Sequence, residues 1–224
     1  MSETPPDCTS KLKYLSQEPL VGGMPLTEMD GGVTPTNQFF VRNHFPMPTI
    51  DASQWRLAVS GEVHHPLKLS SEDLKSLPTR YLTCLLECAG NSRVAVQPPV
   101  EGLLWDHGGV SNARWGGVPV SAILERAGLR SGVLEVLFEG ADAGKERGTD
   151  AVAHYAMSLP MDRAMHPDTL LAYEMNGEQL TPVHGYPLRL ITPGWYGMAS
   201  VKWLTSIRVI VYPFKGFHQS DYYV

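Results

Sequence analysis

Apolar and polar residues alternate along several stretches of the chain, and this pattern predicts strands. Residues 55–63, WRLAVSGEV, place Trp55, Leu57 and Val59 on one face and then reach a glycine. This is typical of a half-buried strand followed by a turn. The clearest alternation runs over residues 201–212, where the odd-numbered positions are apolar or β-branched. We expect a long strand there, with one face against the core.

Two short helices are predicted between the strands. Residues 69–78 offer serines for an N-cap, carry acids in the first turn and end at Pro78. Residues 118–130 have a proline near their start and place Gly128 as a C-terminal cap. Two further strands are predicted at residues 133–140 and 186–192. Residues 80–86 have as much strand character as helix character. Because these elements interleave without regular βαβ alternation, we predict the α+β class, with more strand than helix.

Composition agrees with an ordinary folded domain. Hydrophobic residues make up 43% of the 224 residues and charged residues 18%, which suits a buried core. The 21 glycines and 18 prolines predict many turns between short elements. No linker rich in serine, glycine or charge divides the chain. We therefore expect one domain over residues 1–224, in which residues 1–34 form an N-terminal extension.

Charge and targeting signals argue against several classes of partner. A net charge of -5 creates no field that would attract nucleic acid or an acidic membrane. No apolar run approaches the roughly 18 residues needed to span a bilayer, and the N-terminus has neither a signal-peptide core nor paired arginines. We therefore expect no nucleic-acid or membrane partner and a cytoplasmic location.

The three cysteines, Cys8, Cys84 and Cys88, are too few and too uneven for a disulfide scaffold. A structural zinc site is disfavoured as well, since the sequence has no second closely spaced Cys/His pair. Cys84 lies among leucines and is expected to be a small core residue. Cys88 is followed by Ala-Gly-Asn and soon by Arg93, and a nearby cation favours the thiolate. From the residues alone, Cys88 can be a metal ligand, a nucleophile or a structural thiol.

Two other clusters have an anion-binding character. Arg42, Asn43 and His44 lie between aromatic and proline-rich flanks in residues 39–48, FFVRNHFPMP. Rigid apolar neighbours suit a preorganised anion site, although an exposed turn would have the same composition. The second cluster is residues 184–203, HGYPLRLITPGWYGMASVKW, which contain potentially cationic side chains among glycines but no P-loop. Together with the cysteine motif, these clusters suggest one large anionic cofactor.

The three clusters, in this order and at these intervals, resemble the molybdopterin-binding domain of the sulfite oxidase family. The motifs are RNHFPMP, CAGNSR and HGYPLRLITPGWYGMASVKWL, supported by GLLWDHGGVSNARWGGVPV, FEGAD and AYEMNGEQL. The resemblance extends from about residue 35 to residue 223. It implies a mixed, β-rich fold with several sheets and short helices. It also implies a cofactor of molybdenum and molybdopterin.

The resemblance assigns roles to single residues. It implies that Cys88 is the protein's thiolate ligand to molybdenum, and soft thiolates do favour transition metals. Arg42 and Arg93 would line the substrate pocket, Trp105 would pack against it, and the active-site tyrosine would be Tyr222, with Tyr223 as second choice. The residues that would hold the pterin and its phosphate are Asn43, His44, Asp142, His184, Arg189, Ser200 and Lys202.

The implied activity is oxidation of sulfite to sulfate, with electrons passed to an external acceptor such as a cytochrome. Two arginines converging on a small oxyanion suit this chemistry, because each offers a forked pair of N–H donors. No C-x-x-C-H haem-attachment motif or cytochrome b5-like segment is present in the sequence, so we expect no haem.

Two departures from the family pattern leave alternatives open. Glu101 stands where sulfite-oxidising members commonly have a lysine, so either its carboxylate points away from the pocket or the substrate differs. The chain also ends at Val224, where larger members continue into a dimerisation domain that lends an arginine to the pocket. The alternatives are a nitrate or sulfoxide reductase of the same family and a non-catalytic carrier of the cofactor.

Overall fold

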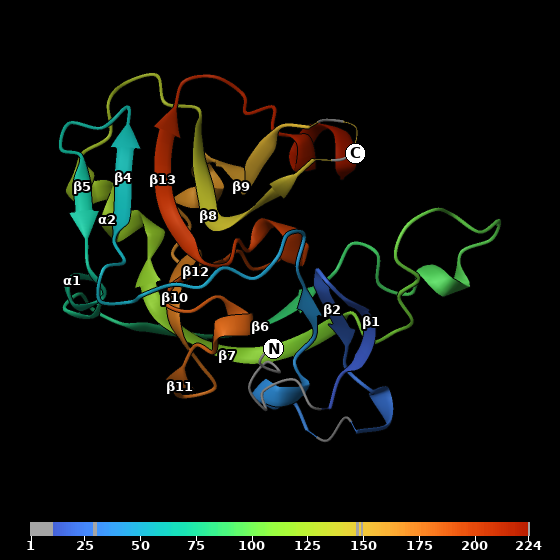
Figure 1. Cartoon of the computed structure of the whole chain (residues 1–224). Coiled ribbons are helices and arrows are strands. Elements are labelled where there is room, and N and C mark those ends of the chain that lie inside the picture. Colours follow the sequence, from blue (N-terminus) through green and yellow to red (C-terminus); the bar gives the residue numbers. More distant parts are fainter. Residues whose placement is uncertain (1–10, 29–30, 147, 149, 224) are drawn as a thin grey trace.

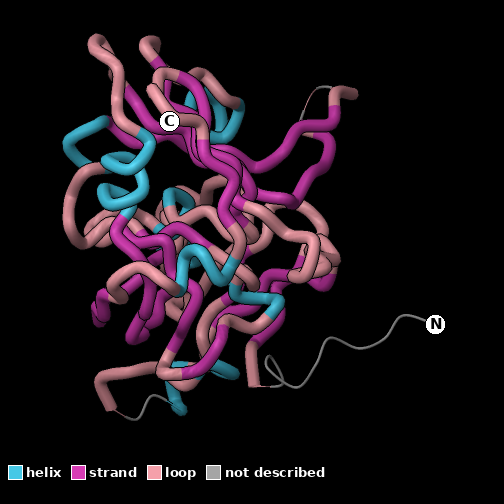
Figure 2. Tube along the Cα trace, turned by 90° about the vertical axis from the view of Figure 1, so that its left-hand side faces the viewer, coloured by secondary structure: helices cyan, strands magenta, loops and turns pink. Residues whose placement is uncertain are grey.

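The computed structural model describes residues 11–28, 31–146, 148 and 150–223. The strands within these residues form three sheets (Figure 1). Helices are short and strands predominate (Figure 2), so the predicted β-rich α+β class is confirmed. No helix within the described residues is long and apolar enough to cross a membrane. Cys8 lies outside the described residues.

The largest apolar core lies on a five-stranded sheet of order β5-β4-β13-β8-β9. Strand β13 pairs in parallel with β4 and antiparallel with β8. The strands of this sheet are β4 (Leu57–Gly61), β5 (Leu67–Leu69), β8 (Glu135–Lys145), β9 (Val152–Pro160) and β13 (Leu204–Ile210). Helix α2 (Val120–Ala127) buries Ile123 and Leu124 in the same core and ends at Gly128, so the helix predicted over residues 118–130 is confirmed.

A second five-stranded sheet has the order β11-β10-β7-β6, and β12 also pairs with β10. Its strands are β6 (Arg80–Glu87), β7 (Val110–Pro119), β10 (Leu170–Met175), β11 (Glu178–Gln179) and β12 (Arg189–Ile191). The ambiguous segment at residues 80–86 is therefore a strand. Trp105 and Trp115 dominate the apolar cluster beside this sheet, and Cys84 is half-buried against that cluster.

The third sheet is three-stranded and consists of β1 (Lys13–Gln17), β2 (Leu20–Gly23) and β3 (Val41–Arg42). Strands β1 and β2 come from the segment expected to be an N-terminal extension, and β2 pairs with β3 directly before Asn43 and His44. Residues 11–28 thus help to place the first of the three motifs.

The remaining helical elements are short. Helix α1 (Ser71–Lys75) begins at the predicted serine, with Ser70 as N-cap and a reciprocal hydrogen-bond pair to Asp73. The others are the α-helix α3 (Met161–Ala164), the 3-10 helices η1 (Leu26–Glu28), η2 (Thr36–Gln38), η3 (Arg93–Ala95), η4 (Pro182–His184) and η5 (Gly197–Ala199), and the π-helix η6 (His218–Tyr222).

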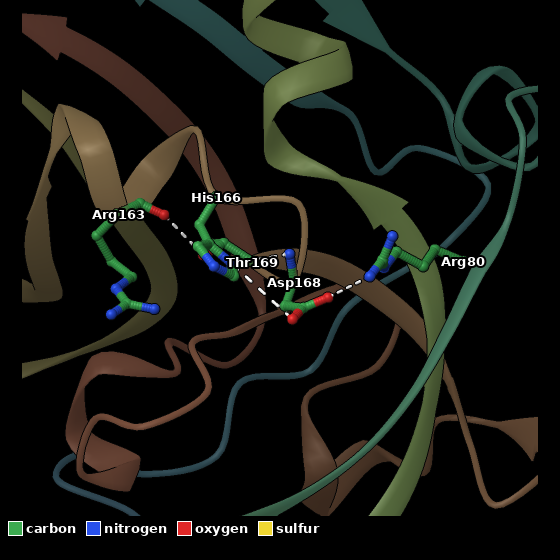
Figure 3. A network of polar contacts seen from close by, with 5 residues as sticks. All are labelled: Arg80, Arg163, His166, Asp168 and Thr169. Carbon is green, nitrogen blue, oxygen red and sulfur yellow. Dashed lines mark hydrogen bonds and ion pairs between the residues drawn. The ribbon is translucent and has the colours of Figure 1, made fainter.

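The turn between α3 and β10 is linked to the start of β6. Asp168 forms an ion pair with Arg80 and lies beside His166, while Thr169 Oγ1 donates to the Arg163 carbonyl at 2.7 Å (Figure 3). Because Cys88 directly follows the other end of β6, this network helps to hold the strand that carries the thiol. The ion pair is partly exposed, so we expect it to contribute at most about 1 kcal/mol.

Strand β13 begins three residues later than the alternation predicts. Trp203 has a φ of 50° and its indole N–H donates to the Pro182 carbonyl at 2.7 Å, so the backbone turns there instead of continuing the pleat. At the other end Val211, expected on the buried face, is 49% exposed. The turn at Trp203 leaves Lys202 outside the sheet and among the residues of a pocket.

Candidate molybdenum-cofactor site

One pocket gathers residues from all three sheets. It encloses about 650 Å³ of space not filled by protein atoms, part of it open to solvent. Nine residues predicted for the site line this pocket: Arg42, Asn43, His44, Cys88, Asp142, His184, Arg189, Ser200 and Lys202. The three motifs, far apart in the sequence, therefore meet at one site.

Cys88 reaches the pocket because the chain turns sharply after β6. Its N–H donates to the Gly109 carbonyl at 2.8 Å, and its carbonyl accepts the Asn91 N–H at 2.9 Å. The Asn91 side chain closes the turn by accepting the Gly109 N–H at 2.9 Å. Burial raises the pKa of the Cys88 thiol, whereas the Gly90 N–H and the nearby arginines oppose this rise. A bound metal ion would favour the thiolate further.

The cationic side chains of the third motif lie in the pocket wall. Lys202 Nζ donates to the Asn43 side-chain oxygen and, at 3.1 Å, to the Val183 carbonyl. Arg189 donates to the His184 carbonyl at 3.0 Å and to the Ser200 carbonyl at 3.3 Å. Burial lowers the pKa of Arg189 to about 9, which still leaves the guanidinium charged at neutral pH. A ligand in this pocket is thus met by fixed positive charge.

Gly185 leaves room for Arg189 and Lys202 to lie close together in the pocket wall. It has a φ of 105°, and a Cβ there would lie 3.1 Å from the Cβ atoms of both Arg189 and Lys202. His184, beside it, is in contact with the Thr36 carbonyl at 3.0 Å through Nε2. Burial lowers the pKa of His184 to about 3, so the ring is neutral at physiological pH.

Three buried polar atoms of the pocket lining have no hydrogen-bond partner among the described residues. They are Asn43 Nδ2, Asp142 Oδ1 and Arg189 Nε. Buried polar atoms without a partner are rare and costly in native proteins. Two of these atoms are donors and one is an acceptor, so they fit a polar ligand with both kinds of group, as the pterin and its phosphate have. Burial raises the pKa of the Asp142 carboxyl, which a ligand N–H donor would offset.

Arg42, His44 and Tyr223 also line the pocket, and each is partly exposed. Arg42 directly precedes Asn43 and donates to its carbonyl. His44 Nε2 lies 2.6 Å from the Tyr223 hydroxyl, and its ring stacks on Tyr155 with centroids 4.5 Å apart. Burial and then the charge of Arg42 lower the pKa of His44 well below its usual value, so the ring is neutral. Burial raises the pKa of Tyr223, so the phenol keeps its proton.

Tyr223, the second choice from the sequence, therefore lines the pocket. Tyr222, the first choice, does not belong to the pocket lining and is 40% exposed. Tyr222 is the last residue of the π-helix η6 and Tyr223 is the residue after it, and sequence alone does not give the orientation of their side chains. Of the two tyrosines, Tyr223 is therefore the candidate for the active-site tyrosine.

Arg93 and Trp105 lie near Cys88 but outside the pocket lining. Arg93 packs against Gly90 and Gly102 and donates to the Leu103 carbonyl at 3.3 Å. Trp105 is buried and meets the Phe40 ring edge to face, with centroids 6.1 Å apart. Since Phe40 itself lines the pocket, Trp105 supports the wall from behind.

Some lining residues were not identified from the sequence. Tyr155 lies under His44, and its hydroxyl donates to the Met198 carbonyl at 2.8 Å. Phe39, Met198 and Trp203 also line the pocket. Tyr155 and Trp203 belong to strand-like alternating stretches, where an aromatic residue is an ordinary core residue, so no local signal separates them from the core.

Comparisons with known proteins give a consistent result. Residues 44–218 match the family model described as oxidoreductase molybdopterin binding domain. The chain is 39% identical to a sulfite oxidase from Arabidopsis thaliana over 99% of its own length and 59% of that protein. It is 38% identical to the nitrate reductase [NADH] 1 of Arabidopsis thaliana over 96% of its length, but spans 24% of that enzyme.

A solved structure agrees as well. The sulfane dehydrogenase SoxCD from Paracoccus pantotrophus superposes with a TM-score of 0.82 and 30% identity, covering 93% of this chain and 52% of that one. The chain thus spans less than two thirds of the length of each of these relatives. The motifs, the polar pocket and the family match together show that the chain belongs to the sulfite oxidase family and contains its oxidoreductase molybdopterin-binding domain.

Proposed function

We infer that this protein is a molybdenum-dependent oxidoreductase that oxidises sulfite to sulfate and passes the electrons to an external acceptor such as a cytochrome. The observation that carries the proposal is the grouping of Arg42, neutral His44 and protonated Tyr223. They line the same pocket as the Cys88 thiol. A cation beside hydrogen-bonding groups suits a small oxyanion.

The site residues divide into cofactor holders and substrate residues. Cys88 would supply the protein's thiolate to molybdenum, while Lys202, Arg189 and Asn43 would hold the anionic part of the pterin, and Asp142 its N–H groups. When bound, the molybdenum cofactor supplies the two-electron redox change and the transfer of oxygen. Overall, sulfite and water give sulfate, two protons and two electrons, and the electrons leave to the acceptor.

On the substrate side, each group has a definite physical task. Arg42 offers its guanidinium to the sulfite oxygens and compensates their charge. Tyr223 keeps its proton because burial raises its pKa, so it can donate a hydrogen bond to an oxyanion. His44 holds that hydroxyl at 2.6 Å. Arg93 lies close enough to Cys88 to oppose the burial-driven rise of the thiol's pKa.

Glu101 is exposed and is not among the lining residues of the pocket. This placement is consistent with the expectation that its carboxylate points away from the substrate.

Steady-state oxidation of sulfite by molybdenum-loaded protein, with ferricyanide or cytochrome c as acceptor, tests the proposal. Reduction of nitrate and of a sulfoxide by a reduced dye, and oxidation of a sulfane-sulfur donor, should be measured alongside, because relatives are named as nitrate reductase and sulfane dehydrogenase. We expect sulfite to give the highest kcat/KM. Absent sulfite turnover would reject the assignment, and transfer of the cofactor to an apo-enzyme without any turnover would favour the carrier alternative.

Metal analysis of Cys88→Ser tests the metal ligand. The serine variant should lose the metal's charge-transfer absorption and most activity, because an alkoxide oxygen replaces a soft sulfur donor. Cys84→Ser is the matched control, since burial raises the pKa of Cys84 to about 11 and its half-buried side chain lies outside the pocket lining. An unchanged spectrum in the Cys88 variant would show that Cys88 is not the ligand.

A further inference from the structure

Tyr223 directly follows the π-helix η6 (His218–Tyr222). Its hydroxyl lies 2.6 Å from His44 inside the pocket. The π-helix η6, which leads to it, is too short to be stable alone. Something outside the pocket must therefore hold the segment that delivers Tyr223.

A hydrogen-bond network outside the pocket provides this anchor. Strand β9 is the edge of its sheet, so alternate N–H groups along it have no neighbouring strand. The Ser158 N–H is paired instead by Gln219 of η6, whose Oε1 accepts it at 2.8 Å. The same amide group donates from Nε2 to Ser158 Oγ at 2.8 Å. Gln219 thus binds both the backbone and the side chain of one buried residue.

Glu135, at the start of β8, extends the network. Its Oε2 accepts the Ser158 hydroxyl at 2.6 Å and the backbone N–H of Phe214 at 3.0 Å. The chain that leaves β13 is therefore held first at Phe214 and again at Gln219, five positions later. Figure 1 shows η6 next to β9, at the side of the sheet away from β5 and β4.

His218 connects this anchor with the pocket. It is 6% exposed, and its ring packs against the stacked pair of Tyr155 and His44, with its centroid 4.8 Å from each of theirs. Its backbone carbonyl accepts the Tyr223 N–H at 3.2 Å. A shift of Gln219 away from β9 would consequently move His218 and withdraw the Tyr223 hydroxyl from His44.

We propose that Gln219, Ser158 and Glu135 form a C-terminal clamp, in which Gln219 is a positioning residue that holds Tyr223 in the pocket. None of these three residues is among the lining residues of the pocket, so the clamp acts through Tyr223. The inference rests on the proposed function only for the catalytic consequence. The placement of Tyr223 follows from the hydrogen bonds themselves.

Hydrogen exchange of residues 214–223, followed by mass spectrometry on the molybdenum-loaded protein, tests the clamp directly. Gln219→Met keeps the length of the side chain but removes both hydrogen bonds, and we expect exchange in this peptide to become about five- to tenfold faster. Ser158→Ala keeps the bond from the Ser158 N–H and should give a smaller increase. Ser220→Ala is the matched control in the same helix, because its hydroxyl has no hydrogen bond to the described residues.

Turnover in the same variants separates positioning from general stability. Gln219→Met should change whichever of kcat and KM is changed by Tyr223→Phe, and in the same direction. In the Tyr223→Phe background it should have no further effect, because the clamp acts only through that hydroxyl. Wild-type exchange rates in Gln219→Met, or an additive loss of activity in the double variant, would overturn the proposal. Faster exchange in Gln219→Met, together with no sulfite turnover by the wild type, would support the clamp and reject the sulfite assignment alone.

Discussion

Replacing Lys202 with methionine should weaken retention of the cofactor without weakening the cofactor-free fold. The ammonium group is buried, and burial followed by the charge of Arg189 lowers the pKa of Lys202 well below its usual value. In the cofactor-free protein it has Asn43 and the Val183 carbonyl as hydrogen-bond acceptors. Hydrogen bonds to a charged donor contribute about 1.5–3 kcal/mol each, whereas desolvation of the ion costs several kcal/mol. The free energy of unfolding should therefore change little or increase.

The loaded protein should respond in the opposite way. There the Lys202 ammonium would pair with an anionic group of the cofactor, and removing one partner of a buried ion pair costs about 3–5 kcal/mol. Since about 1.4 kcal/mol corresponds to a factor of ten, affinity should fall by roughly two to nearly four orders of magnitude. This combination of an unharmed fold and a lost ligand distinguishes a cofactor residue from a structural one.

Two measurements on the Lys202→Met variant test these two expectations. Urea unfolding of the cofactor-free protein, followed by tryptophan fluorescence, reports the fold, and molybdenum content during dialysis reports retention. Lys68→Met, at an exposed position of β5, is the control and should match the wild type in both. If the Lys202 variant loses more than about 2 kcal/mol of cofactor-free stability but releases the cofactor at the wild-type rate, the reasoning is wrong.

Two further predictions concern pH and the choice of tyrosine. Burial lowers the pKa of His184 from 6.5 to about 3. Its contribution to stability is therefore complete above pH 6.5 and is lost as pH falls towards the folded pKa, by up to about 1.4 kcal/mol per pH unit. Urea unfolding between about pH 7 and 5 should show a smaller pH slope in His184→Gln, and exposed His65→Gln should keep the wild-type slope. Tyr223→Phe should lower kcat/KM for sulfite by roughly 10²-fold, whereas Tyr222→Phe should stay within a factor of about three. The reverse order of the two tyrosine variants would return the role to Tyr222.

Local patterns in the sequence predicted the elements well where the residues act locally. The N-cap at Ser70 and the cap at Gly128 bound helices as expected, because capping depends on a few adjacent residues. Alternation predicted the centre of β13 but not its start. There, a tertiary contact of Trp203 with the Pro182 carbonyl competes with the pleat. Element ends are decided by such distant partners, which periodicity does not encode.

The residues of the candidate site also include some that the sequence identified and others that it did not. The motif residues Asn43, Cys88 and Lys202 were identified from the sequence, because charged and small residues gather there in an unusual order. Tyr155 was not, since an aromatic residue in an alternating strand is normally a core residue, and only its place under His44 sets it apart. Arg93 was predicted to line the pocket but lies outside the lining, held by the Leu103 carbonyl.

By itself, the sequence determined the β-rich class and the family, and it supplied the candidate residues for holding an anionic cofactor, because composition, periodicity and motif order are properties of the chain alone. Only the tertiary structure decided which of two adjacent tyrosines enters the pocket and that Gln219 anchors it. In the proposed clamp, both depend on the Ser158 N–H at the edge of β9, which no neighbouring strand pairs and which lies 61 positions from Gln219 in the sequence. Such a contact exists only after the sheet has formed, and no local pattern in either segment predicts it.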